Sequence, residues 1–135
     1  MRYEEIKRYK YRTVQDENYV LAESFPAVDT YWVKLRGNKL WIRRGYAWDG
    51  CSGGAPDHKN SRNASLVHDI LYQLMKTSKL SMKYRKNADL CFRDLLLRGG
   101  CWRVHAATYY RGVRLGGRLA LKRGKKRIIY EALLS

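Results

Sequence analysis

Two ionisable groups stand inside apolar helical patterns, and they restrict the possible folds more than any other feature of the chain. His68 lies in the apolar stretch 67–72, and Asp89 lies in the similar stretch 88–92. Burying an imidazole or a carboxylate is costly unless the group gains a hydrogen-bonded partner. We therefore expect two helices that pack together and bring His68 and Asp89 to each other.

The N-terminal third predicts a small antiparallel sheet. Strand-like pieces occur at residues 9–14 and 19–21, with a turn at 15–18 between them. Residues 30–35 and 39–43 are rich in aromatic and β-branched side chains and flank Arg36-Gly37-Asn38. Strands of this kind around a Gly-Asn turn are typical of a hairpin, so we expect its turn at Gly37.

Helical spacing of apolar residues predicts a helix from Ser61 to about Lys76, capped by Asn60 or Ser61. A second helix is expected to begin at Ser78 or Ser81, run to about Leu97 and end at the glycine pair 99–100.

A third helix is expected from Trp102 to Leu115, broken by Gly116 and Gly117. Four of its residues are predicted to face inward: Val104, Ala107, Tyr110 and Val113. Residues 118–135 form a basic helix candidate interrupted at Gly124.

These elements predict an α+β fold, with a small N-terminal antiparallel sheet followed by a bundle of three to four helices. The length suits a single domain over residues 1–135. Within it we distinguish a β-rich part (1–48), a Gly-rich loop (49–60), a helical part with the His-Asp pair (61–117) and a basic C-terminal tail (118–135).

The formal net charge of +16 is unusual for 135 residues and predicts an anionic partner. The basic residues that we expect to contact it are Arg111, Arg114, Arg118, Lys122, Arg123, Lys125, Lys126 and Arg127. Such a surface could follow a nucleic-acid backbone, lie on an anionic membrane or dock on an acidic protein. The alternative is a solvated basic face that serves only solubility.

Cys51, Cys91 and Cys101 form no C-x-x-C pair, which argues against a disulfide framework and a cysteine-based zinc site. The N-terminus lacks the apolar core of a signal peptide, and no apolar run approaches the length of a transmembrane segment. We expect synthesis in a reducing cytoplasm.

The paired residues also suggest chemistry. A buried carboxylate that orients a histidine ring is the core of a general base. His68 would deprotonate a water, Asp89 would hold the ring and balance the imidazolium, and Tyr72 would steady the carboxylate. Asp69, on the neighbouring helix face, could bind calcium with oxygens of the loop, because calcium accepts irregular sets of oxygen ligands. The metal-ligand candidates are Asp69, Asp49, Gly50, Gly53 and Gly54.

Each element of this interpretation has a purely structural alternative. His68 and Asp89 could form an interior pair that only fixes helix packing, or Asp89 could pair with Arg85 or Arg93 one turn away. Asp49 could cap a turn, and the glycines could serve only as turn residues. A zinc site that includes His58 matches no standard ligand spacing.

Four motifs, in order, resemble a family of phage and prophage domains of unknown function, number 1353. They are GYAWDGCS at 45–52, LVHDILY at 66–72, RKNADLCF at 85–92 and YYRGVR at 109–114. In the loop, Cys51 stands where the family commonly has alanine, and two glycines and an alanine precede Pro56. The resemblance implies a bacteriophage origin and, by itself, no settled activity. We expect synthesis in the cytoplasm of the host bacterium and incorporation in the virion.

A shorter pattern is similar to phospholipase A2, especially the disulfide-free form of parvovirus capsids. It consists of Gly54-Ala55-Pro56, His68-Asp69 with Tyr72, and Ala88-Asp89 with Phe92. The similarity implies that His68 is the general base, Asp89 its carboxylate and Asp69 a calcium ligand, completed by carbonyls near Gly50, Gly53 and Gly54. Calcium would then polarise an ester carbonyl. The loop departs from the pattern because it lacks the Tyr-Gly-x-Gly series.

Two functions follow from these observations. The first is a virion-associated phage protein that hydrolyses lipid esters during entry or release. The second is a non-catalytic phage component that binds nucleic acid or an acidic virion partner through its basic surface.

Overall fold

The computed structural model describes residues 3–4, 11–48 and 61–134, and it gives the backbone alone for residues 3–4, 120 and 122–134. Two antiparallel sheets come first. One contains β1 (Tyr3–Glu4), β2 (Tyr11–Thr13) and β5 (Ala47–Trp48) in that order, and the other pairs β3 (Glu17–Asp29) with β4 (Val33–Ile42). The helices follow as α1 (Arg62–Lys76), the short 3-10 helix η2 (Met82–Tyr84), α2 (Arg85–Arg98) and α3 (Arg103–Leu134). The predicted α+β fold is confirmed.

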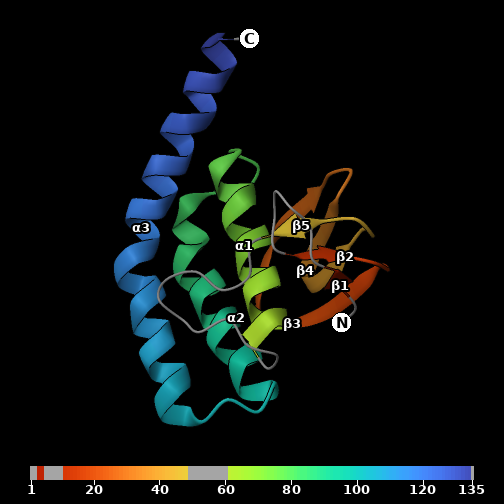
Figure 1. Ribbon diagram of the computed structural model, residues 1–135, viewed down its shortest axis with the longest axis vertical. Coiled ribbons are helices and arrows are strands. Elements are labelled where there is room, and N and C mark those ends of the chain that lie inside the picture. Colours follow the sequence, from red (N-terminus) through yellow and green to blue (C-terminus); the bar gives the residue numbers. More distant parts are fainter. Residues whose placement is uncertain (1–2, 5–10, 49–60, 135) are drawn as a thin grey trace.

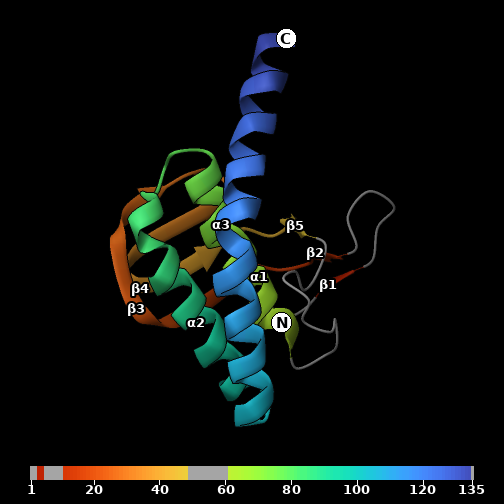
Figure 2. The ribbon, with the colours of Figure 1, turned by 90° about the vertical axis from the view of Figure 1, so that its left-hand side faces the viewer.

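The three long helices stand side by side, and the strands lie against one side of them (Figure 1). Helix α2 contacts α1, α3 and strand β3, so it is the centre of the packing. Helix α3 continues past the ends of α1 and α2 and projects from the body of the molecule (Figure 2). None of the helices in the described part of the chain combines the length and apolarity needed to span a membrane.

The hydrophobic core fills the space between the helices and the inner face of the β3–β4 ribbon. Buried residues alternate along β3 and β4, as expected for strands with one face on a core. On β4 the buried positions are Val33 and Leu35, then Leu40 and Ile42. The buried positions have odd residue numbers up to Leu35 and even residue numbers from Leu40. The alternation is therefore interrupted by one extra residue between Leu35 and Leu40.

That insertion explains why the predicted hairpin turn at Gly37 is wrong. Strand β4 runs straight through Gly37 and Asn38, and the turn lies instead between Asp29 and Val33. Gly37 has a φ of +59° and is paired with Phe25 between two register shifts. One type of bulge places its first residue in this left-handed conformation, which glycine adopts without steric cost. Gly37 therefore lies in a bulge of β4 and not in a hairpin turn.

The first two helices agree with the sequence. Helix α1 begins after Ser61 and ends at Lys76, and it buries the apolar side chains that recur at helical spacing. Ser81 accepts a hydrogen bond from the backbone N–H of Lys83 and so caps η2, which leads directly into α2. Helix α2 ends at Arg98 with Gly99 as its C-cap, and Gly100 has a φ of +94°.

The third helix differs from the prediction. Instead of breaking at Gly116 and Gly117, α3 is one helix of 32 residues that also passes through Gly124. Gly117 is buried against Tyr72 of α1, and a Cβ atom at that position would overlap the tyrosine hydroxyl oxygen. Its lack of a side chain therefore serves close helix packing.

The inward face of α3 is also displaced from the predicted one. Val113 is buried as predicted and Tyr110 is partly buried, but Val104 and Ala107 are exposed. Ala106 and Leu121 are buried although they were not predicted to face inward. Gly117 makes the closest approach of α3 to Tyr72. The inward face of α3 is therefore the face that contains Gly117. A helix that ends at Leu115 contains neither Gly117 nor Leu121, so its apolar periodicity cannot indicate the face that they define.

Gly117→Ala should destabilise the protein by about 1–3 kcal/mol, because the added methyl group must displace the Tyr72 ring. Gly116 is the matched control, since a Cβ atom there meets nothing within 4 Å. Gly116→Ala should be stabilising by about 0.5–1 kcal/mol through helix propensity alone. Urea unfolding of both variants measures the difference, and equal free energies of unfolding would contradict the close packing.

Candidate active site between three helices

Asp89 lies at the point where the three helices meet. Its side chain is fully buried, and both carboxylate oxygens accept hydrogen bonds. On Oδ1 they come from His68 Nε2 and the Tyr72 hydroxyl, each at 2.7 Å. Both donors lie on α1, four residues apart, so one helix face presents them together. The predicted cluster of His68, Tyr72 and Asp89 is thus assembled.

Two arginines approach the other oxygen of Asp89. Arg114 Nη1 from α3 lies 3.0 Å from Oδ2, and Arg85 Nη1 from α2 lies 3.6 Å from it. Arg85 also donates to the backbone carbonyl of Arg114 at 3.0 Å. One carboxylate therefore links α1, α2 and α3.

These contacts keep Asp89 ionised. Burial by itself disfavours the charged form and raises the pKa of Asp89. The hydrogen bonds from His68 and Tyr72, with the contribution of Arg114, act in the opposite direction and outweigh it. The pKa of Asp89 is therefore lower than that of an ordinary aspartate.

An ionised carboxylate can only accept hydrogen bonds, and this fixes the position of a proton on His68. The proton of the His68–Asp89 bond must belong to Nε2, so Nδ1 of the neutral ring carries the lone pair. Within the described residues, no side chain or backbone group is hydrogen-bonded to Nδ1. The ring is 4% exposed and packs against Tyr72 and Phe92, at centroid distances of 4.1 and 4.9 Å.

Tyr72 serves the carboxylate as a hydrogen-bond donor. Burial, followed by its hydrogen bond to Asp89, raises the pKa of the Tyr72 hydroxyl well above the ordinary tyrosine value. The hydroxyl thus keeps its proton and holds Oδ1 in place. This agrees with the position predicted for Tyr72 beside the carboxylate.

Asp69 follows His68 in the chain, but it is hydrogen-bonded to Tyr46, which is not among the residues around Asp89. Its Oδ2 accepts a hydrogen bond from the Tyr46 hydroxyl at 3.0 Å. The other predicted calcium ligands, Asp49, Gly50, Gly53 and Gly54, lie outside the described residues. Among the side chains that the structure describes, no three of His, Cys, Asp or Glu come together as a metal site. One carboxylate with backbone carbonyls is a different kind of ligand set, and it suits calcium.

The buried cysteine of α2 is not a nucleophile candidate. Cys91 is buried, and desolvation raises the pKa of its thiol to about 11. A thiol reacts as its thiolate, which is scarce at neutral pH when the pKa is this high. Cys91 and Cys101 are both unpaired thiols.

The predicted anion-binding residues fall into three groups. Arg111 and Arg118 are exposed on α3, and Arg114 is engaged by Asp89. For Lys122, Arg123, Lys125, Lys126 and Arg127 the structure describes the helical backbone only.

Three contributors to the site were not predicted in the role that the structure gives them: Arg114, Arg85 and Tyr46. Arg114 was grouped with the basic surface, although it directly follows Val113, which was predicted to face inward. Arg85 was recognised one turn from Asp89, but as a surface pair; Arg93 instead lies over the Tyr110 ring. Tyr46 gave no signal as a partner of Asp69, because their contact joins segments 23 residues apart.

Asp89→Asn should destabilise the fold by about 3 kcal/mol at neutral pH, because it leaves two arginines beside a neutral, buried amide. The stabilisation by Asp89 is present above the unfolded pKa of aspartate, about 3.9, and is lost as the pH falls through the lower folded value. The difference between wild type and variant should therefore shrink in acid. Urea unfolding at neutral and acidic pH measures it.

Asp94→Asn is the matched control on the same helix. Asp94 pairs with Arg98 at the surface, an interaction worth about 0.5 kcal/mol or less. Equal effects of the two substitutions would show that Asp89 does not organise the bundle.

Comparison with known proteins relates this site to a family. Residues 31–113 match the family described as protein of unknown function (DUF1353). The match includes His68, Tyr72 and Asp89 and ends one residue before Arg114. Comparison with curated proteins and with solved structures gives no match. Because the matched segment covers more than half of the chain, the protein belongs to the DUF1353 family.

Proposed function

We propose that this protein hydrolyses lipid esters, with His68 as the general base. The observation that carries the proposal is the 2.7 Å bond between His68 Nε2 and the ionised Asp89, which leaves the lone pair on Nδ1. A base prepared in this way can accept a proton from water. The shared pattern of His68-Asp69, Tyr72 and Asp89 supports phospholipase-like chemistry over other hydrolytic reactions.

In the proposed reaction Nδ1 of His68 takes a proton from a water molecule, whose oxygen forms a bond to the ester carbonyl carbon. The tetrahedral intermediate then collapses, the carbon–alkoxide bond breaks, and His68 returns the proton to the leaving oxygen. Asp89 keeps the ring oriented and balances its transient positive charge. Tyr72 and Arg114 are positioning residues, because they act through Asp89.

Calcium is part of the same proposal. Asp69 and the carbonyls of Gly50, Gly53 and Gly54 would hold the ion, and bound calcium would polarise the ester carbonyl. Tyr46 would orient the Asp69 carboxylate through its hydroxyl.

The biological setting that we propose is a bacteriophage virion. The protein would be made in the cytoplasm of the host bacterium, join other virion proteins and act on the lipid of the bacterial envelope. The strong positive charge supports this role, because bacterial membranes present anionic headgroups.

A second candidate function is a non-catalytic phage component that binds nucleic acid or an acidic virion protein. The projecting end of α3 favours it, because the backbone there extends beyond the other helices and carries a basic sequence (Figure 1). In this alternative the His68–Asp89 pair only fixes helix packing.

His68→Gln should lower hydrolysis of mixed anionic phospholipid vesicles by at least about 100-fold, the usual contribution of a general base. His105→Gln is the matched control, because His105 is exposed on α3 and stacks on Trp102. Release of fatty acid measures the turnover, and circular dichroism checks the fold. Full activity of His68→Gln would exclude the proposed base. A folded wild type without turnover would favour the second candidate.

Calcium should raise the melting temperature of the wild type, and a chelator should reverse the effect, since a ligand that binds only the folded state stabilises it. Asp69→Asn should remove this shift, and Asp94→Asn should keep it. Thermal unfolding with and without calcium tests the metal site independently of catalysis. An equal shift in wild type and Asp69→Asn would exclude Asp69 as a ligand.

A further inference from the structure

We propose that the outer face of the β3–β4 ribbon binds single-stranded nucleic acid in a groove beside Trp41. This inference is independent of the proposed hydrolysis, because the groove shares no residue with the His68 cluster. It also differs from the α3 surface considered above.

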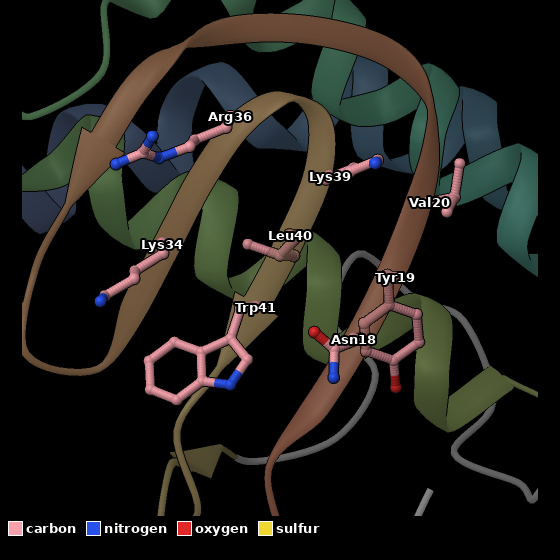
Figure 3. A pocket seen from close by; sticks show the side chains of 8 residues that line it. All are labelled: Asn18, Tyr19, Val20, Lys34, Arg36, Lys39, Leu40 and Trp41. Atoms are coloured by element: carbon pink, nitrogen blue, oxygen red, sulfur yellow. The ribbon is translucent and has the colours of Figure 1, made fainter.

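The groove results from the irregular pairing of the two strands. Regular pairing runs from Glu17 opposite Ile42 to Val20 opposite Lys39, and then a register shift separates Val20 from Phe25. The hollow on the outer side has a volume of about 320 Å³. Figure 3 shows side chains from both strands around it, among them Tyr19, Lys34, Arg36, Lys39, Leu40 and Trp41.

The charge of the groove is positive. Lys34, Arg36 and Lys39 line it, and none of the eight lining residues is acidic. Asp29 is the register partner of Lys34. Within the described residues, however, these three cations form no ion pair. They are therefore available to an anion from outside the chain.

Trp41 adds an aromatic surface beside these cations. Its indole is partly exposed, with Lys34 Nζ at 5.6 Å and the Arg43 guanidinium at 5.4 Å from the ring centroid. Proteins that bind single strands combine stacking on aromatic rings with cations along the backbone. Lys34 and Arg36 are alternate residues of one strand, so their side chains leave the same face about 6.6 Å apart. This arrangement suits successive phosphates of an extended strand.

The chemistry of the groove favours a nucleic-acid strand over a membrane surface. Binding to a leaflet needs apolar side chains that protrude into the lipid. Of the residues that line the groove, Val20 is an exposed aliphatic side chain, at 57%, whereas Leu40 is buried in the core. One valine beside three cations offers little to insert into lipid, whereas the cations and the Trp41 ring suit a phosphate backbone and its bases.

Fluorescence anisotropy with a labelled oligothymidylate tests the proposal, with His68→Gln and a chelator present so that hydrolysis has no part in the result. Three phosphate contacts predict a slope of about −2 for log affinity against log salt, or about a 20-fold loss between about 50 and 200 mM salt. The triple variant Lys34→Gln, Arg36→Gln, Lys39→Gln should lose at least about tenfold in affinity and most of the slope.

Trp41→Ala should weaken binding about fivefold or more, and Trp41→Phe should restore part of it, since stacking needs only an aromatic face. The matched control removes the same number of exposed positive charges on and near the helices: Lys79→Gln, Lys83→Gln and Lys86→Gln. This control should bind like the parent protein. Rescue by phenylalanine separates stacking from a general loss of structure.

Three results would overturn the proposal. Equal losses in the ribbon and control triples would show that only net charge matters. A loss confined to Arg111→Gln with Arg118→Gln would assign binding to α3. Ribbon-dependent binding to anionic vesicles without oligonucleotide binding would assign the groove to lipid phosphates.

Discussion

The buried carboxylate of Asp89 is the interaction on which the helical half of the molecule depends. It lies on α2 and accepts hydrogen bonds from His68 and Tyr72 of α1 and from Arg114 of α3. A buried charge is tolerated only when its partners are complete, so the three helices must meet at this point. Gly117 belongs to the same constraint, because it gives the Tyr72 hydroxyl room to reach Asp89. The cluster therefore defines the packing of the bundle, whatever chemistry it performs.

Much of the fold follows from local patterns, and the errors share one cause. The N-terminal antiparallel β-structure, the first two helices and the pairing of His68 with Asp89 were predicted, because periodicity and the cost of burial are properties of short segments. Gly37 and Gly117 were interpreted as a turn and a helix end, but they allow a bulge and a close helix contact. A glycine in the sequence indicates either a close approach of another group or a backbone φ that other residues rarely adopt. Only the residues that surround it in the fold decide between the two.

The candidate site was also predictable only in part. The sequence indicates His68, Tyr72 and Asp89 because they are polar residues on apolar helix faces. Arg114, by contrast, belongs to a basic stretch in which no arginine differs from its neighbours. Arg114 lies within the predicted helix from Trp102 to Leu115, next to Val113, which faces inward. The helix was therefore predicted at this point, but the contact of Arg114 with Asp89 was not.

The two arginines affect the proposed chemistry as well as the packing. A protonated His68 would share one carboxylate with Arg85 and Arg114, so the cluster as a whole would carry excess positive charge. That charge lies in a protein interior, where electrostatic interactions are stronger than in water. It would favour an anionic tetrahedral intermediate next to the imidazolium. Arg85 also has a structural part, because it donates a hydrogen bond to the backbone carbonyl of Arg114 and so joins α2 to α3. Under the proposed hydrolysis the same positive charge would in addition stabilise the anion that forms during the reaction.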